Sequence, residues 1–153
     1  MAIHDLPHEA AIALMREPKF SAAPLVWESR PNQANILMAT FQPEDETGAI
    51  IPGLSIQLEV KKAIVVDRCG YEMGLLKLVG KARRRAYQLA VTPPDKRSHN
   101  DVLGPIYGPH EHLGDRVIPV TDPRIRCGEL RAAFDRLCQQ INLTYTGNGS
   151  MPL

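Results

Sequence analysis

The residues best suited to chemistry lie in one short stretch, from Tyr107 to Arg116. It contains two imidazoles, His110 and His112, separated by the carboxyl group of Glu111. Side chains alternate between faces in an extended segment, so the two histidines would share one face and Glu111 would point to the other. Glycines before and after the pair indicate turns, which predicts a segment at the rim of a sheet.

Paired imidazoles suit acid–base cleavage of RNA, because histidine titrates near neutral pH. His110 and His112 are the candidate base and acid: one removes the proton of the 2′-hydroxyl and the other protonates the leaving oxygen. Arginine stabilises the charge that develops on phosphorus, and Arg116 is the candidate for this role. No metal or other cofactor is required. The residues expected to bind the substrate are Arg84, Arg85, His99 and Tyr107.

Two other interpretations of the histidine pair stay open. A His-x-His segment can present two nitrogens to one metal ion, with His99, Asp115 or Glu111 completing the ligand set. Alternatively, both histidines hold a surface loop through hydrogen bonds to backbone carbonyls and have no catalytic role.

Charge is distributed unevenly along the chain, although the net charge is only +1. Residues 1–60 carry three basic and eight acidic side chains, whereas residues 61–97 carry ten basic and three acidic ones. Such a basic block can attract phosphate, or it can be the solvated face of a sheet that meets the acidic N-terminal third.

Composition favours a soluble domain in the cytoplasm. The 153 residues suffice for one core, and no apolar run reaches the roughly 20 residues that cross a bilayer. The N-terminus lacks the pattern of a secretory signal. The widely spaced Cys69, Cys127 and Cys138 predict three free thiols.

The elements that would position these residues are mainly strands. Period-two alternation over 54–60 predicts a strand with one wet face, and further strands are expected at 25–27, 35–41, 63–66, 75–79, 85–91 and 117–120. In the strand at 85–91, Arg85 should share a face with Tyr87. Residues 95–109 are expected to form a loop, and Pro119 favours a sheet edge for the last strand.

Helices are expected at both ends of the chain. A short helix is predicted at 8–15. An apolar stripe predicts a second helix at 129–141 that lies on the sheet. Ahead of this stripe, Asp122 followed by proline resembles the start of a helix. The fold class is therefore α+β: one domain over 1–143, with about five to seven mainly antiparallel strands and both helices on one face. Residues 144–153 are expected to be a flexible tail.

The order of these motifs resembles a family. Pro-Pro-Asp-x-x-x-His99 is followed by Gly-Pro-His110-x-His112, a Gly-Asp-Arg segment, an edge strand and a helix with Leu130-x-x-x-Phe134-x-x-x-Cys138. Over residues 54–143 this is similar to small bacterial proteins encoded by prophages and mobile elements, and more loosely to the TumE-like toxins of type II toxin–antitoxin loci. The resemblance implies a ribonuclease held inactive by an antitoxin, with His110, His112 and Arg116 as the carried-over positions. The alternative is a module that binds nucleic acid or protein without cutting it.

Overall fold

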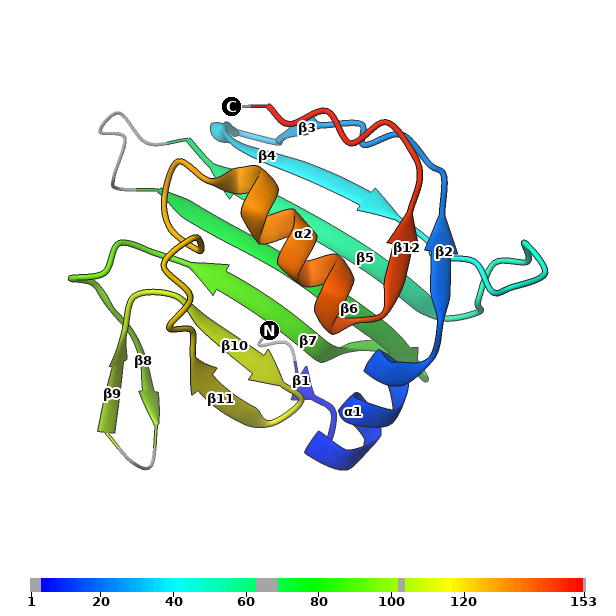
Figure 1. Ribbon diagram of the computed structural model, residues 1–153, viewed down its shortest axis with the longest axis horizontal. Helices are drawn as coiled ribbons and strands as arrows, with labels where there is room; N and C mark the ends of the chain where they lie inside the picture. Colours follow the sequence, from blue (N-terminus) through cyan, green and yellow to red (C-terminus); the bar gives the residue numbers. More distant parts are fainter. Residues whose placement is uncertain (1–3, 63–68, 102–103, 153) are drawn as a thin grey trace.

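The computed structural model describes residues 4–62, 69–101 and 104–152. The helices are α1 (His8–Arg16) and α2 (Leu130–Gln140). The strands are β1 (His4–Asp5), β2 (Lys19–Ser21), β3 (Glu28–Arg30), β4 (Gln33–Phe41), β5 (Leu54–Lys61), β6 (Gly70–Val79), β7 (Ala82–Val91), β8 (Arg97–Asp101), β9 (Gly104–Tyr107), β10 (His110–Leu113), β11 (Arg116–Pro119) and β12 (Leu143–Tyr145). This is the α+β fold that the sequence predicts, with a mainly antiparallel sheet (Figure 1).

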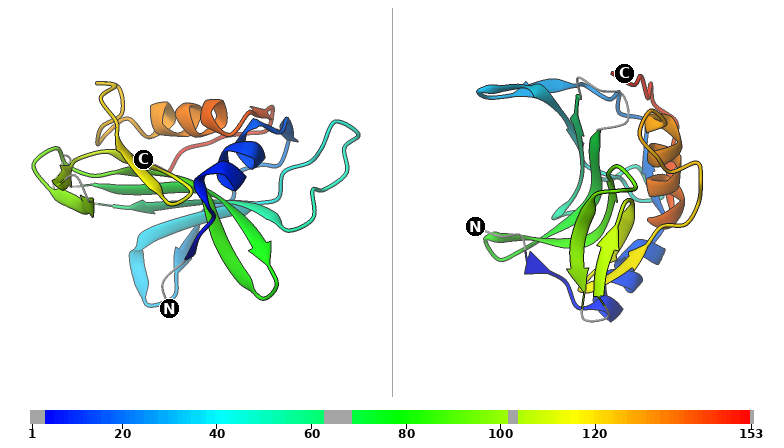
Figure 2. Two further views of the ribbon diagram at one scale, coloured as in Figure 1. Left: turned by 90° about the horizontal axis from the view of Figure 1, so that it is seen from below. Right: turned by 90° about the vertical axis from the view of Figure 1, so that its left-hand side faces the viewer.

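The main sheet has the strand order β11-β10-β7-β6-β5-β4-β3, and β1 adds a short parallel pairing to β7. Helix α2 lies on one face of this sheet, while the β3–β4 and β6–β7 hairpins extend away from it on the other side (Figure 2). The face under α2 is apolar because the strands alternate as the sequence predicts. In β5 the residues on that face, Leu54, Ile56, Leu58 and Val60, are at most 2% exposed.

The core lies between the sheet and the two helices. Helix α2 contributes Leu130, Ala133, Phe134 and Leu137, and α1 contributes Ala11 and Met15. No helix in the described part of the chain is both long and apolar enough to span a membrane.

Three expectations about the course of the chain are corrected. The loop expected at 95–109 contains the β8–β9 hairpin, which forms a separate two-stranded sheet. The tail is tied into the fold: β12 pairs with β2, and the Trp27 indole N–H donates to the Ser150 carbonyl oxygen at 2.8 Å. Asp122 does not begin a helix, because its carboxylate binds Arg124 and α2 begins only at Leu130. The strand expected at 63–66 lies outside the described residues.

The prediction of three free thiols is wrong, since Cys69 and Cys127 form a disulfide. Their Cα atoms are 5.5 Å apart, although 58 residues separate them in the sequence. This bond ties the start of β6 to the loop before α2. Cys138 keeps a free thiol, and burial raises its pKa to about 12. Wide spacing in the sequence concealed a contact that arises because the loop before α2 packs against the start of β6.

A fully buried lysine fastens the C-terminal ends of both helices. The Lys19 ammonium group donates to the carbonyl oxygens of Leu14 at 2.5 Å, Glu17 at 2.7 Å and Ile141 at 2.8 Å. The last carbonyl groups of a helix have no hydrogen-bond donors within the helix, and a cation near them also interacts favourably with the helix dipole. Burial lowers the pKa of Lys19 to about 8.

Candidate functional site

Strand β10 carries both histidines and behaves as the alternation rule predicts. Gly108 and Gly114, with φ angles of +73° and +61°, form the turns at its two ends. His110 and His112 lie opposite Ala90 and Gln88 of β7, on the face away from α2, whereas Glu111 points to the helix side. The strand is not at the sheet's rim, however, because β11 covers it and takes the edge position.

The two histidines line an open pocket of about 350 Å³, which we call the histidine pocket. It collects polar and cationic side chains from four strands, β6, β7, β8 and β10, and from the segment that joins β7 to β8. Its lining residues are Glu72, Arg85, Gln88, Ala90, Thr92, Lys96, Arg97, His110 and His112. Both histidines are nearly buried, at 4% and 5% exposed. The pocket therefore combines imidazoles with three cationic groups.

Arg85 reaches this pocket because β7 contains a bulge. Opposite Leu75 stands Tyr87, yet opposite the next residue, Leu76, stands Arg85, so Ala86 is the extra residue in the ladder. A bulge reverses the alternation of side chains. Arg85 consequently lies on the pocket face with Gln88, and the prediction that it shares a face with Tyr87 is wrong.

A chain of hydrogen bonds fixes the polar groups at the centre of the sheet. The Arg85 Nε donates to Asp5 Oδ1 at 2.6 Å, and its Nη1 donates to the Gln88 side-chain oxygen. The Gln88 amide nitrogen in turn donates to a carboxylate oxygen of Glu72 at 3.5 Å. Gln88 thus accepts from the arginine and donates to the carboxylate, which sets its orientation.

Glu72 has an unusual environment for a carboxyl group. Burial raises its pKa above the ordinary value, and so does the negative charge of Glu59, which lies directly opposite it on β5. The cations Arg85, Arg30 and Lys96 oppose this change without cancelling it. Carboxyl groups with raised pKa values in a cleft are typical of functional sites.

The imidazole rings touch each other. Their centroids are 5.1 Å apart, and the planes meet at 65°, an edge-to-face contact. His110 Nδ1 lies 3.2 Å from the Gly108 carbonyl oxygen, and a carbonyl accepts only from a protonated nitrogen. Nδ1 of His110 therefore carries the hydrogen in this contact.

The other predicted site residues are not all in this pocket. In the β10–β11 ladder, Arg116 stands opposite Leu113. Because Leu113 directly follows His112, its side chain points to the other face of the sheet, and the side chain of Arg116 lies on that face too. Arg84 is likewise on the face opposite Arg85. Tyr107 is 54% exposed and stands opposite Arg97 in the β8–β9 hairpin, beside the pocket. The backbone of His99 lies in β8, and its side chain is outside the described part of the structure.

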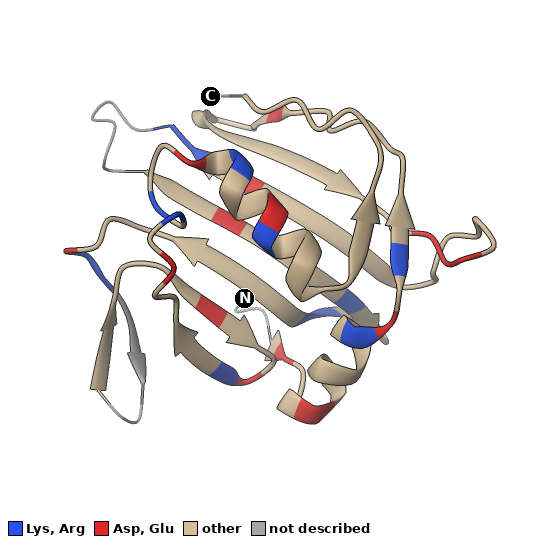
Figure 3. Cartoon of the chain, viewed as in Figure 1, with Lys and Arg blue, Asp and Glu red and all other residues tan. Residues whose placement is uncertain are grey.

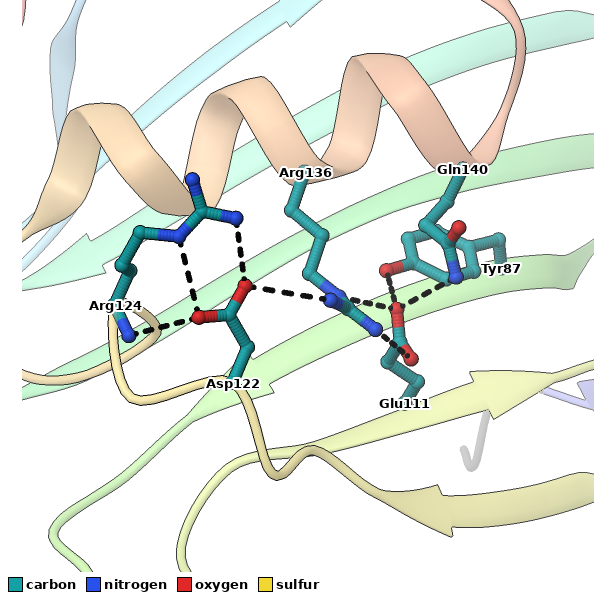
Figure 4. Close-up of polar contacts among 6 residues, drawn as sticks. All are labelled: Tyr87, Glu111, Asp122, Arg124, Arg136 and Gln140. Carbon is teal, nitrogen blue, oxygen red and sulfur yellow. Dashed lines mark hydrogen bonds and ion pairs between the residues drawn. The ribbon is translucent and has the colours of Figure 1, made fainter.

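On the helix side, Glu111 is the centre of a buried polar network (Figure 4). Arg136 of α2 donates to its two carboxylate oxygens at 2.9 and 2.8 Å, Gln140 donates at 3.0 Å, and the Tyr87 hydroxyl donates at 2.5 Å. Burial would raise the pKa of Glu111, but these hydrogen bonds outweigh it and lower the pKa below its usual value. Burial and the neighbouring carboxylate raise the pKa of Tyr87. Glu111 therefore attaches β10 to the helix and is not a pocket residue.

The metal interpretation loses part of its ligand set. Glu111 faces away from the histidines, and the Asp115 carboxylate accepts from the backbone N–H of His8 at the start of α1. Among the residues that the structure describes, no three His, Cys, Asp or Glu side chains are grouped so that they could hold a metal ion.

The basic block of residues 61–97 does not form a single patch. Lys77 and Arg84 stand opposite each other in the β6–β7 ladder, on the face of the sheet that carries α2. Arg85, Lys96 and Arg97 line the histidine pocket on the other face. Figure 3 shows basic and acidic residues interspersed across the sheet, α2 and the loops. Only part of the block is available to one anion.

Sequence reasoning missed Glu72, Gln88, Lys96 and Arg97 as pocket residues. A signal for Glu72 exists: it alternates with Tyr71 and Met73, which are buried on the other face. The sequence analysis expected this strand to begin at Leu75, whereas β6 begins at Gly70, so Glu72 was not included. Arg97 lay in a segment expected to be a loop.

Comparisons of the chain with protein-family models, curated proteins and solved structures found no match. The resemblance to TumE-like toxins therefore stays a prediction.

Proposed function

We propose that this protein is an endonuclease that cleaves RNA in the histidine pocket without a metal ion. The observation that carries the proposal is that His110 and His112 face one open pocket together with Arg85, Lys96 and Arg97. Imidazole supplies proton transfer near neutral pH, and cationic side chains bind phosphate and stabilise its transition state. The pocket thus holds the two kinds of group that phosphodiester cleavage needs.

Within this scheme the histidine pair acts on the leaving group. The attacking 2′-oxygen displaces the 5′-oxygen from phosphorus, which yields a 2′,3′-cyclic phosphate and a free 5′-hydroxyl. We assign His110 as the proton donor, because the Gly108 carbonyl oxygen fixes the orientation of its ring. The ring of His112 contacts the ring of His110 edge-on and helps to hold it in position. Arg85 replaces Arg116 as the arginine proposed to bind the phosphate.

The test is cleavage of single-stranded RNA by the purified protein in the presence of EDTA. We expect fragments with cyclic phosphate ends, and a loss of at least about 100-fold in His110→Ala, the range of general acid–base catalysis. His112→Ala should also lower the rate. Arg116→Ala is the matched control, because its side chain lies on the other face of the sheet, next to the same strand.

Other outcomes would refute the proposal in distinct ways. RNA binding without cleavage would indicate the non-catalytic module. Cleavage that EDTA abolishes would indicate a metal-dependent enzyme. Cleavage that persists in both histidine variants would point to a contaminating nuclease.

The toxin role and the cytoplasmic location are part of the same proposal. A toxin of this kind is inactivated by a partner antitoxin, which would have to block the pocket or the path to it. Induced expression of the chain in bacteria should stop growth, and His110→Ala should relieve the arrest. Normal growth of cells that accumulate the folded wild-type protein would refute the toxin role.

A further inference from the structure

We infer that Glu72 is the general base of this site and faces the histidine pair across Ala90. The inference rests on the proposed function and assigns the half of the reaction that the two histidines cannot perform together. It also changes the sequence-based scheme, in which one imidazole was base and the other acid.

The spacing of the histidines is the first step of the argument. In an in-line displacement the attacking and leaving oxygens lie on opposite sides of phosphorus. With a hydrogen bond of about 2.7 Å at each end, base and acid must be roughly 8 to 9 Å apart. Rings with centroids 5.1 Å apart in edge contact leave no room for a phosphate between them. The pair therefore stands on one side of the substrate.

The register of the sheet identifies the group on the other side. Glu72 of β6 lies opposite Ala90 of β7, and Ala90 lies opposite His110 of β10. Neighbouring strands are about 4.8 Å apart, so the Cα atoms of Glu72 and His110 are separated by roughly 10 Å. Alanine between them has only a methyl group. The result is a floor with a carboxyl group on one side and an imidazole on the other.

The phosphate would lie between these two groups and beside the cations. Arg85 is attached to Gln88, which donates to Glu72, so the arginine and the carboxylate are held in one network. The charged and titratable groups that face Glu72 come from every neighbouring element. They are Glu59 from β5, Arg30 from β3, Arg85 from β7, Lys96 from the β7–β8 connection, Arg97 from β8, and His110 and His112 from β10.

The electrostatics agree with the role of a general base, because they raise the proton affinity of the Glu72 carboxylate. Burial and Glu59 raise the pKa of Glu72. A base whose pKa lies closer to the working pH binds the transferred proton more strongly and is a better catalyst. Arg30, which pairs with Glu59 at 2.9 Å, moderates the repulsion between the two carboxylates.

The proton balance of the step is complete. The Glu72 carboxylate takes the proton of the 2′-hydroxyl as the bond from O2′ to phosphorus forms. The bond from phosphorus to O5′ breaks, and O5′ takes a proton from the imidazolium of His110. Exchange with water then deprotonates Glu72 and protonates the imidazole.

The experiment is the pH dependence of kcat/KM for RNA cleavage by the wild-type protein, Glu72→Gln and Glu59→Gln. Wild-type activity should rise with pH as Glu72 ionises and fall as imidazolium is lost. Glu72→Gln should lower kcat/KM by at least about 100-fold and abolish the rising limb. Glu59→Gln should move this limb to lower pH, because a neighbouring negative charge is gone. If Glu72 had only a structural role, Glu59→Gln would not move the rising limb of the pH profile.

The results separate this inference from the proposed function. If the wild-type protein cleaves RNA and Glu72→Gln keeps both its rate and its rising limb, Glu72 is not the base, while the histidine pocket stays the active site. An unmoved limb in Glu59→Gln would contradict the assignment equally, without relying on the folding of the Glu72 variant. If the wild-type protein cleaves no RNA, both proposals are wrong.

Discussion

Replacing Arg136 by alanine should strongly destabilise the protein, because it leaves a buried carboxylate without its cation. The Glu111 side chain is 5% exposed, and Arg136 donates to both of its oxygens. Breaking a buried pair from one side costs about 3–5 kcal/mol. Arg136 itself keeps 25% of its side chain exposed, so we expect a loss near the lower end, about 3 kcal/mol.

The measurement is urea-induced unfolding followed by circular dichroism, with Arg131→Ala as the control. Arg131 lies on the same helix and pairs with Asp135, but both side chains are about 60% exposed. Exposed pairs contribute at most about 1 kcal/mol. If the free energy of unfolding falls by a similar amount in the two variants, the Glu111 network does not stabilise the fold.

The loss in Arg136→Ala should also depend on pH. Hydrogen bonds lower the pKa of Glu111 in the folded protein, so its stabilising effect is present above the unfolded pKa near 4.5 and is lost as pH falls through the folded value. The difference between wild type and Arg136→Ala should therefore be smaller at pH 3 than at pH 7. A difference that does not change with pH would contradict an ionised Glu111.

Three further predictions concern stability. Reduction of the Cys69–Cys127 disulfide, which closes a separation of 58 residues, should lower the free energy of unfolding by about 4 kcal/mol, measured in urea with and without reductant. Lys19→Met should lower it by about 3 kcal/mol, because several buried carbonyl oxygens lose their donor; an unchanged midpoint would refute this. Glu72→Gln should stabilise the protein at pH 7 and not at pH 4, because the raised folded pKa of Glu72 destabilises the fold by an amount that grows as pH rises above the unfolded pKa and is complete above the folded pKa; equal shifts at both pH values would contradict the raised pKa.

The sequence predicted the elements whose signal is local. Alternation over 54–60 gave β5 and its buried face, and the apolar stripe at 129–141 gave α2. Alternation in β10 correctly separated His110 and His112 from Glu111. Each of these follows from the spacing of side chains along one segment.

What the sequence could not reveal depends on pairing between segments. The bulge at Ala86 is visible only in the register of β7 against β6, and it decides which of Arg84 and Arg85 enters the pocket. Arg116 is excluded by its register against β10, although it is close to the histidines in sequence. The disulfide likewise depends on how distant parts of the chain are brought together.

The network at Glu111 protects β10 against misalignment. Sliding this strand by one residue would turn the imidazoles toward α2 and the carboxylate toward solvent, because side chains alternate with a period of two. Arg136 would then face a ring in place of its anion, and the fit between the layers would be lost. A bond on the reverse side of the sheet thus defines where the imidazoles lie. Proteins that keep the pocket but change the helix residue should need a new way to align the strand.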